Sequence, residues 1–196
     1  MKVVAVSQRV DFLSDRNEFR DALDQRLIDF MANCGALAVP VPNTLVDANK
    51  LNVWLLNVKP SAILLSGGNN IGDCPERDQT ERMLLTHARL TTLPVLGICR
   101  GMQMMGVFAG AALKSVAGHV GARHALSGLI EGEVGSFHNQ ALIDVPAEYI
   151  VLARSGDGVI EAIRHEHLPW EGWMWHPERE REYLERDIDR LKKLLA

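Results

Sequence analysis

Short apolar runs alternate four times with helical patterns in the first 109 residues, and this feature most constrains the fold. The apolar runs predict buried strands at residues 2–6, 36–41, 62–65 and 94–98. The spacing of apolar residues between them predicts helices at residues 18–33, 46–58, 76–90 and 101–109. Such alternation is typical of βαβ units, and strands that are apolar throughout are buried on both faces. We therefore expect an α/β protein with a central, mostly parallel sheet and helices on both faces.

The remainder of the chain has a different pattern. Residues 112–175 contain short strand-like pieces separated by turns with glycine. A charged amphipathic helix is predicted from Pro177 onward, with Leu184, Ile188, Leu191 and Leu195 on one face. No internal repeat or linker interrupts the 196 residues. We therefore expect residues 1–196 to form a single domain.

Composition argues against several classes of protein. The net charge is −4 and no basic run is present, which argues against nucleic-acid partners and a polybasic membrane surface. No apolar stretch approaches the roughly 18 residues of a membrane span, and no signal peptide is recognisable. The three cysteines are widely spaced and odd in number, which does not indicate a disulfide framework. The sequence therefore predicts a cytoplasmic protein with free thiols.

The strongest chemical signal is Gly97-Ile98-Cys99-Arg100-Gly101. It joins a predicted strand to a predicted helix and carries glycines two residues before and after the cysteine. The same arrangement, with serine, forms the nucleophile elbow of α/β-hydrolases. Glycine on each side removes the Cβ atoms that would block so sharp a turn, and the N–H of Arg100 is suited to donate to an oxyanion. Cys99 is therefore the predicted nucleophile, whereas Cys34 belongs to an apolar helical face and Cys74 lacks a partner base.

A thiol nucleophile needs a base, and the base needs a group that orients it. Among seven histidines, His176 is the best candidate because Glu178 follows two residues later. Residues two apart in an extended segment point the same way, so the carboxylate can hold the imidazole. The apolar run Trp173-Met174-Trp175 is suited to a buried strand that brings this pair to the edge of the sheet. The predicted triad is Cys99, His176 and Glu178.

Three motifs together resemble the class I glutamine amidotransferase superfamily. They are Ser66-Gly67-Gly68, the segment from Gly97 to Gln103, and His176-Pro177-Glu178, in that order along the chain. The resemblance implies a flavodoxin-like fold and a Cys-His-Glu triad. It also implies an oxyanion hole formed by the N–H groups of Gly68 and Arg100, and a role for Gln103 in binding a glutamyl group.

Within this superfamily, the chain is similar to the stand-alone γ-glutamyl hydrolases, including those that act on γ-glutamyl-γ-aminobutyrate. The similarity is carried by Arg100 and by the segment Ser136-Phe137-His138-Asn139-Gln140. It implies a small-molecule γ-glutamyl substrate and contacts from Ser136, Phe137 and His138.

A narrower similarity, to the γ-glutamyl-CDP-amidate hydrolases of capsule synthesis, is carried by Ser7-Gln8-Arg9 and by the segment from Met174 to Glu180. A diphosphate in the leaving group would need basic side chains. Arg9 is the first candidate and Arg123, in a predicted loop, is the second.

Alternatives remain at the level of function. The chain could be a glutaminase subunit that supplies ammonia to a separate synthetase, or a homo-oligomeric enzyme. It could also be a cysteine hydrolase of peptides or esters, or a binding domain that has lost activity.

No metal or organic cofactor is predicted. His165-Glu166-His167 is interpreted as a solvated turn because no third ligand is evident. His119 and His124 lie in a predicted loop and could line the pocket or lie on the surface.

Overall fold

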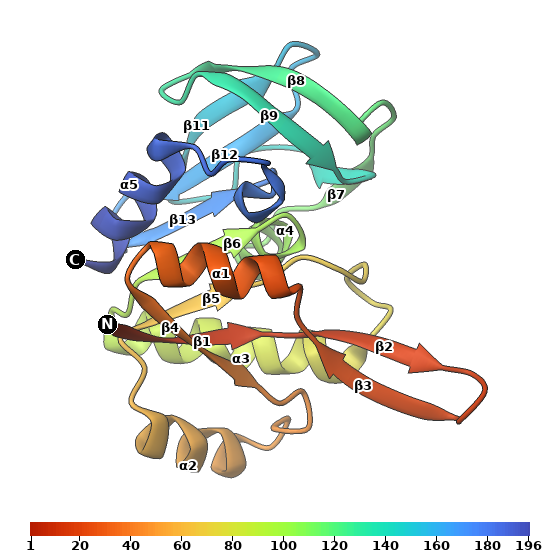
Figure 1. Ribbon diagram of the computed structural model, residues 1–196, viewed down its shortest axis with the longest axis vertical. Helices are drawn as coiled ribbons and strands as arrows, with labels where there is room; N and C mark the ends of the chain where they lie inside the picture. The colour runs from red at the N-terminus through yellow and green to blue at the C-terminus, as the bar shows by residue number, and fades with distance from the viewer.

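A nine-stranded sheet forms the centre of the computed structural model, which describes residues 1–196 (Figure 1). In spatial order its strands are β4 (Ala36–Val41), β1 (Lys2–Ser7), β5 (Ala62–Leu65), β6 (Val95–Ile98), β13 (Trp170–Trp173), β12 (Ile160–His165), β11 (Tyr149–Ser155), β8 (Val120–Gly128) and β9 (Gly132–Phe137). The strands from β4 to β13 are parallel, and the pairs from β13 to β9 are antiparallel. The predicted α/β class and its parallel sheet are confirmed.

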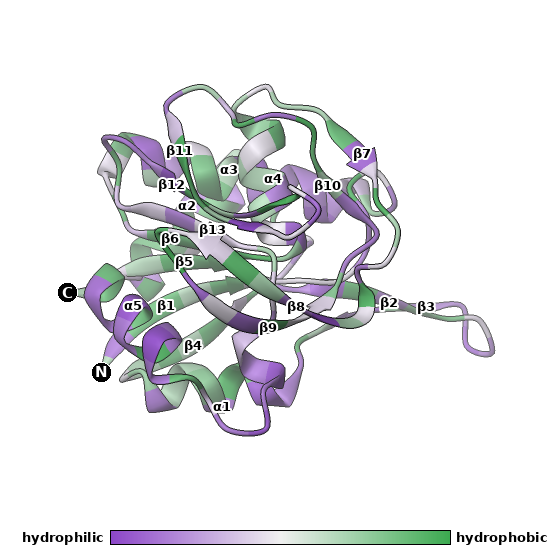
Figure 2. Cartoon of the chain, turned by 90° about the horizontal axis from the view of Figure 1, so that it is seen from above, coloured by the Kyte–Doolittle hydropathy of each residue, from purple (hydrophilic) through white to green (hydrophobic).

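Helices cover both faces of the sheet (Figure 2). One face packs against α1 (Gln25–Asn33) and α5 (Glu185–Leu195), and the other against α2 (Ala48–Val58), α3 (Pro75–Thr91) and α4 (Arg100–Phe108). Strand β1 illustrates why both faces are apolar: Val4 and Val6 join the core beneath α1, whereas Ala5 joins the core beneath α3 and α4. Burial on both faces explains the continuous apolar runs in the sequence.

The predicted helix over residues 18–33 is wrong over residues 18–24. Residues Arg9–Leu13 (β2) and Glu18–Ala22 (β3) form a hairpin that projects from the domain (Figure 1). Phe19 lies on Phe12 across this hairpin, with ring centroids 4.7 Å apart. Helix α1 begins only after Asp24, whose side chain accepts a hydrogen bond from the Arg26 N–H. The cross-strand aromatic pair and this cap therefore prevail over the helical spacing of the apolar residues.

The C-terminal helix also begins later than predicted. Pro177–Arg179 form a short 3-10 turn (η1), and α5 starts at Glu185, after Leu184. Between these elements the Glu180 carboxylate accepts a hydrogen bond from the Gly135 N–H, which ties the segment to β9. No helix of this chain is long and apolar enough to cross a membrane.

The strand-like pieces predicted after residue 112 are confirmed as strands. Most of them extend the main sheet, and β7 (Leu113–Ser115) pairs with β10 (Gln140–Leu142) in a small separate sheet. The parallel strands β5, β6 and β13 lie next to each other, so their carboxyl ends meet at one edge. This edge carries Gly67, Cys99 and His176, and open α/β folds place their ligands at such an edge.

Candidate active site

Cys99 occupies a strained turn between β6 and α4. Its backbone has φ 53° and ψ −107°, a positive φ that is rare for residues other than glycine. The flanking glycines are required by space. A Cβ on Gly97 would lie 2.6 Å from the Gly101 carbonyl carbon, and a Cβ on Gly101 would lie 2.1 Å from the Leu65 carbonyl oxygen. Holding a residue in so sparsely populated a conformation costs about 1–3 kcal/mol, so the predicted elbow is a strained one.

His176 and Glu178 form a buried pair close to Cys99. His176 Nδ1 lies 2.6 Å from Glu178 Oε1, and both residues are about 5% exposed or less. Burial opposes the imidazolium, but hydrogen bonds with Cys99 and Glu178 outweigh it and raise the pKa of His176 to about 9. The stacked rings of Trp173 and Trp175, with centroids 5.4 Å apart, anchor the segment that delivers the pair.

Gly67 lies beside Cys99 and the imidazole of His176, where there is no room for a side chain. A Cβ at this position would lie 2.7 Å from His176 Cε1 and 3.7 Å from Cys99 Cβ. No side chain fits there without moving the histidine. The predicted triad residues are thus neighbours, and they come from the ends of adjacent strands.

Two backbone N–H groups are available beside the nucleophile. The Gly68 N–H has no acceptor within the protein, and Gly68 itself has φ +99°. The Arg100 N–H lies in the first turn of α4, where the first helical bond is donated by Gln103 to the Cys99 carbonyl. First-turn N–H groups have no partner in their own helix. Both groups that the resemblance assigns to an oxyanion hole can therefore donate to a ligand.

A buried ionic network that was not predicted from the sequence supports the loop at Ser66 and Gly67. The Arg77 guanidinium donates to the carbonyl oxygens of Ser66 (2.7 Å) and Gly67 (2.9 Å). Glu81 accepts hydrogen bonds from Arg77 Nε (3.0 Å) and from the Arg100 side chain.

The side chain of Arg100 also binds Asp78, so it points into this network and only its backbone reaches the site. The signal in the sequence was an Arg77–Glu81 pair four residues apart on the buried side of α3.

The predicted substrate contacts are partly brought together. Gln103, Phe137 and His138 line a hollow together with Cys99. The Gln103 amide donates to the Gln140 carbonyl oxygen at 2.9 Å, which fixes its orientation. Ser136 does not line this hollow. It is fully buried, and its hydroxyl donates to the His119 carbonyl at 2.7 Å, so its prediction as a substrate contact is not supported.

A second hollow shares Gly68, His176 and Arg179 with the first and is also lined by Arg9. Arg9 is half exposed, and its guanidinium binds Asp11 at 3.1 Å. The other predicted phosphate contact, Arg123, lies in β8 and not in a loop. It forms an exposed ion pair with Glu180 at 2.9 Å and lines neither of these hollows.

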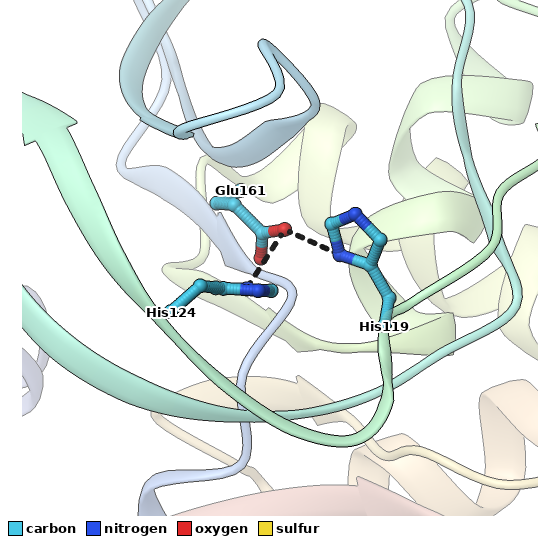
Figure 3. A group of neighbouring side chains, drawn as sticks. All are labelled: His119, His124 and Glu161. Atoms are coloured by element: carbon cyan, nitrogen blue, oxygen red, sulfur yellow. Dashed lines mark ion pairs between the residues drawn. The ribbon is translucent and has the colours of Figure 1, made fainter.

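Three histidines surround a buried carboxylate next to the first hollow. His119 Nδ1, His124 Nε2 and His138 Nε2 each lie 3.3 Å from Glu161 Oε1, and Figure 3 shows His119 and His124 converging on it. Only His138 of the four also lines the hollow that contains Cys99. Glu161 was not a sequence candidate, because β12 has the pattern of an ordinary buried strand.

The other residues considered from the sequence support the fold and are not part of the triad. His165 Nδ1 accepts hydrogen bonds from the N–H groups of His167 and Leu168, and these bonds close a turn. His167 is exposed in this turn, whereas His165 is buried. Cys34 is confirmed as a core residue, and burial raises the pKa of its thiol to about 11. Asn69 pins the glycine loop to Val10 of β2 through two hydrogen bonds of 2.9 Å.

Comparison with known proteins identifies the family. A family model described as glutamine amidotransferase class-I matches residues 17–188. The chain is 30% identical over 125 residues to the γ-glutamyl-CDP-amidate hydrolase of Campylobacter jejuni subsp. jejuni serotype O:2, an alignment that covers 61% of this chain and 62% of that protein. The chain thus spans about three fifths of the length of this relative.

A second relative is one subunit of the glutamine-hydrolyzing GMP synthase of Methanococcoides burtonii. It is 32% identical over 152 residues, which cover 69% of this chain and 74% of that protein. A solved structure from Thermoplasma acidophilum, described as that of a GMP synthase subunit, superimposes with a TM-score of 0.74 at 21% identity, covering 100% of this chain and 94% of the other. The match of the family model over most of the chain, with the same fold in this solved structure, shows that the chain is a member of the class I glutamine amidotransferase family.

Proposed function

We propose that this protein hydrolyses a γ-glutamyl amide bond, with Cys99 as nucleophile, His176 as acid and base, and Glu178 as the orienting carboxylate. The observation that carries the proposal is the strained elbow at Cys99 beside the 2.6 Å contact between His176 and Glu178. A nucleophile, a base bonded to it and a third group that orients the base are the requirements for covalent catalysis by a thiol.

The reaction then follows in two steps. His176 takes the thiol proton of Cys99, the sulfur attacks the γ-carbonyl carbon, and the N–H groups of Gly68 and Arg100 stabilise the oxyanion. His176 donates a proton to the departing nitrogen as the C–N bond breaks, which leaves a thioester on Cys99. His176 next takes a proton from water, the water oxygen attacks the thioester carbon, and glutamate leaves while the thiol is restored.

The two hollows suit the two parts of such a substrate. The glutamyl group belongs in the first hollow, where Gln103, Phe137 and His138 surround Cys99. The departing amine belongs in the second, which shares Gly68, His176 and Arg179 with the first and is also lined by Arg9. A forked guanidinium matches phosphate oxygens, so Arg9 and Arg179 are the candidate contacts for a diphosphate in a hollow that Asp24 and Glu178 also line.

The proposed leaving group is cytidine diphosphoramidate. The similarity to a γ-glutamyl-CDP-amidate hydrolase supports this choice, as do the two arginines of the second hollow. Cleavage at the glutamyl carbon would leave the P–N bond intact, so the products would be glutamate and the phosphoramidate. This chemistry would serve modification of a capsule polysaccharide.

Glutamate release from a panel of γ-glutamyl compounds tests the proposal. The panel holds glutamine, γ-glutamyl-γ-aminobutyrate, γ-glutamyl peptides and γ-glutamyl-CDP-amidate, with Cys99→Ala as the control. We expect cysteine-dependent release from γ-glutamyl-CDP-amidate in preference to glutamine. Equal release from all compounds would argue against the second hollow as a leaving-group site, and release that survives Cys99→Ala would contradict the mechanism.

A second candidate function is that of a glutaminase subunit. The similarity to one subunit of a glutamine-hydrolyzing GMP synthase favours it, because the name of that relative describes one part of a larger enzyme. The triad would act in the same way, but the leaving group would be ammonia. Glutamine hydrolysis that appears only when a separate synthetase is added would favour this function over the first.

A further inference from the structure

The carboxylate of Glu161 is buried without a hydrogen-bond donor. The residue is 0% exposed, and neither of its side-chain oxygens receives a hydrogen bond. Burying an anionic group in this way is strongly unfavourable unless a positive charge compensates it. No lysine or arginine contributes an ion pair to Glu161. Its three ion-pair partners are the imidazoles of His119, His124 and His138, each 3.3 Å from the same oxygen.

Two of these imidazoles have their proton on the side away from Glu161. His138 Nδ1 lies 3.1 Å from the Gln140 carbonyl oxygen, which can only accept, so Nδ1 carries the hydrogen. His119 Nε2 lies 3.0 Å from the Asp157 carboxylate and is the donor there for the same reason. In the neutral rings, His138 Nε2 and His119 Nδ1 therefore direct lone pairs at Glu161 Oε1. Lone pairs facing an anionic oxygen repel each other unless a cation lies between them.

The distances from Glu161 to the three imidazoles match those between ligands of a metal ion. Nitrogen and oxygen ligands lie about 2.0–2.2 Å from Zn²⁺, which places two ligands of a tetrahedron about 3.3–3.5 Å apart. The 3.3 Å separations between Glu161 Oε1 and the imidazole nitrogens fit this edge. The ligand atoms of His119, His124 and Glu161 span up to 4.8 Å, so the two imidazoles would move toward each other when the ion binds.

We propose that His119, His124 and Glu161, with His138 as the fourth ligand, bind a divalent transition-metal ion of the zinc class.

The surroundings of the cluster resemble those of established metal sites. A metal-ligating histidine usually donates its other N–H to a carboxylate or a backbone carbonyl, which fixes the ring and increases its basicity. The bonds from His119 to Asp157 and from His138 to the Gln140 carbonyl fit this pattern. Three imidazoles and one carboxylate favour Zn²⁺ over Ca²⁺ or Mg²⁺, because the latter two prefer ligand sets made only of oxygen.

The ion would act as a clamp between segments that are distant in sequence. His124 lies in β8, Glu161 in β12 and His138 between β9 and β10, whereas His119 immediately precedes β8. Since His138 also lines the hollow with Cys99, the ion would position that wall of the hollow without touching the reacting atoms. Metal binding does not depend on the proposed hydrolysis, so either can fail while the other stands.

Titration of the wild-type chain tests the proposal directly. The protein is stripped with a chelator and titrated with Zn²⁺, and bound metal is counted after gel filtration by elemental analysis. Co²⁺ serves as a second probe, because four-coordinate Co²⁺ with nitrogen and oxygen ligands absorbs in the visible range. We expect one ion per chain and a higher Tm with Zn²⁺. Failure to retain a stoichiometric ion would overturn the proposal and leave protonated imidazoles as the partners of Glu161.

Three variants locate the ion. Glu161→Gln and His124→Ala should lose stoichiometric binding and the Tm shift, whereas His167→Ala should retain both, because His167 is an exposed histidine outside the cluster. Cys99→Ala should also retain the ion, which excludes the thiol and imidazole of the active site as the ligands. Binding that is lost in Cys99→Ala but kept in Glu161→Gln would contradict the assignment. If one cluster variant fails to fold, the other variant and the wild-type titration still decide.

Discussion

The parallel and antiparallel parts of the sheet hold their functional residues in different ways. In the parallel part, the position of Cys99 follows from backbone geometry, since Gly97 and Gly101 leave no room for a Cβ and the cysteine itself takes a positive φ. In the antiparallel part, the side chains of His138, from the loop after β9, and Glu161, from β12, meet at 3.3 Å. A backbone constraint is local and is visible as a short motif. A cluster of side chains appears only when the chain has folded.

The largest expected effect follows removal of the nucleophile. Cys99→Ala should lower kcat at least about 10³-fold, because covalent catalysis is lost while the other groups remain. Cys74→Ser is the matched control, since Cys74 is a free thiol outside the site and should change kcat little. Glutamate release from the preferred substrate measures both. A Cys74→Ser enzyme that is as inactive as Cys99→Ala would show that the elbow is not where the chemistry occurs.

Arg77→Met tests whether the buried ionic network, in addition to backbone geometry, stabilises the parallel part of the sheet. Arg77→Met leaves the Glu81 carboxylate short of one partner in a fully buried position. Breaking such a pair typically costs about 3–5 kcal/mol of unfolding free energy. Arg82→Met on the same helix should cost less than about 0.5 kcal/mol, because Arg82 forms no ion pair. Denaturant unfolding gives both values, and equal costs would mean that the network contributes nothing.

Gly67→Ala probes the narrow space between the glycine loop and the imidazole of His176. The added Cβ would displace His176, since it would lie 2.7 Å from Cε1. A displacement of about 1 Å lowers the rate by about 10²-fold. Gly156→Ala is the control, because its Cβ meets nothing within 4 Å. Both variants should fold, as judged by Tm, and only Gly67→Ala should lose kcat. An unchanged kcat would mean that the loop has room to move.

Glu178→Gln tests the pH dependence of the pair. Hydrogen bonds with Cys99 and Glu178 raise the pKa of His176 from 6.5 to about 9 against the effect of burial. The imidazolium therefore contributes stability fully below about pH 6.5 and loses this contribution as the pH rises through about 9. The difference in unfolding free energy between wild type and Glu178→Gln should be larger at pH 6.5 than at pH 9.5. In a His176→Gln background the Glu178→Gln effect should not change between these pH values.

Arg9→Ala should produce the smallest effect. Arg9 is half exposed, so its contact with a diphosphate is worth about 1 kcal/mol, or a five- to tenfold rise in KM. The rise should appear with γ-glutamyl-CDP-amidate and be absent with glutamine. Arg123→Ala should leave both KM values unchanged, because Arg123 is paired with Glu180 at the surface. A rise in KM for both substrates would mean that Arg9 acts on the glutamyl group or on the loop.

The sequence predicted the parallel half well because its signals are local. The flanking glycines pointed to Cys99, the spacing of two residues linked Glu178 to His176, and the apolar runs matched β5 and β6 closely. The hairpin β2–β3 was missed because Phe19 and Leu23 are also at helical spacing.

The side chain of Ser136 points away from the hollow, which the sequence could not show because a motif gives the position of a residue and not the direction of its side chain. The cluster around Glu161 depends on contacts over long sequence separations, which no window of the sequence contains. The contacts of Arg77 with Ser66 and Glu81 are local, but the sequence does not show that these groups are buried together.

The left-handed backbone at Cys99 has a consequence for the history of such chains. Glycine adopts this conformation freely, so Cys99→Gly would relieve the local strain and raise the stability of the fold while abolishing the chemistry. Selection for catalytic activity must therefore act continuously against substitutions that make the fold more stable but inactive. A descendant that carries glycine at this position and keeps Gly97 and Gly101 would be expected to retain the architecture after its catalytic role has been abandoned.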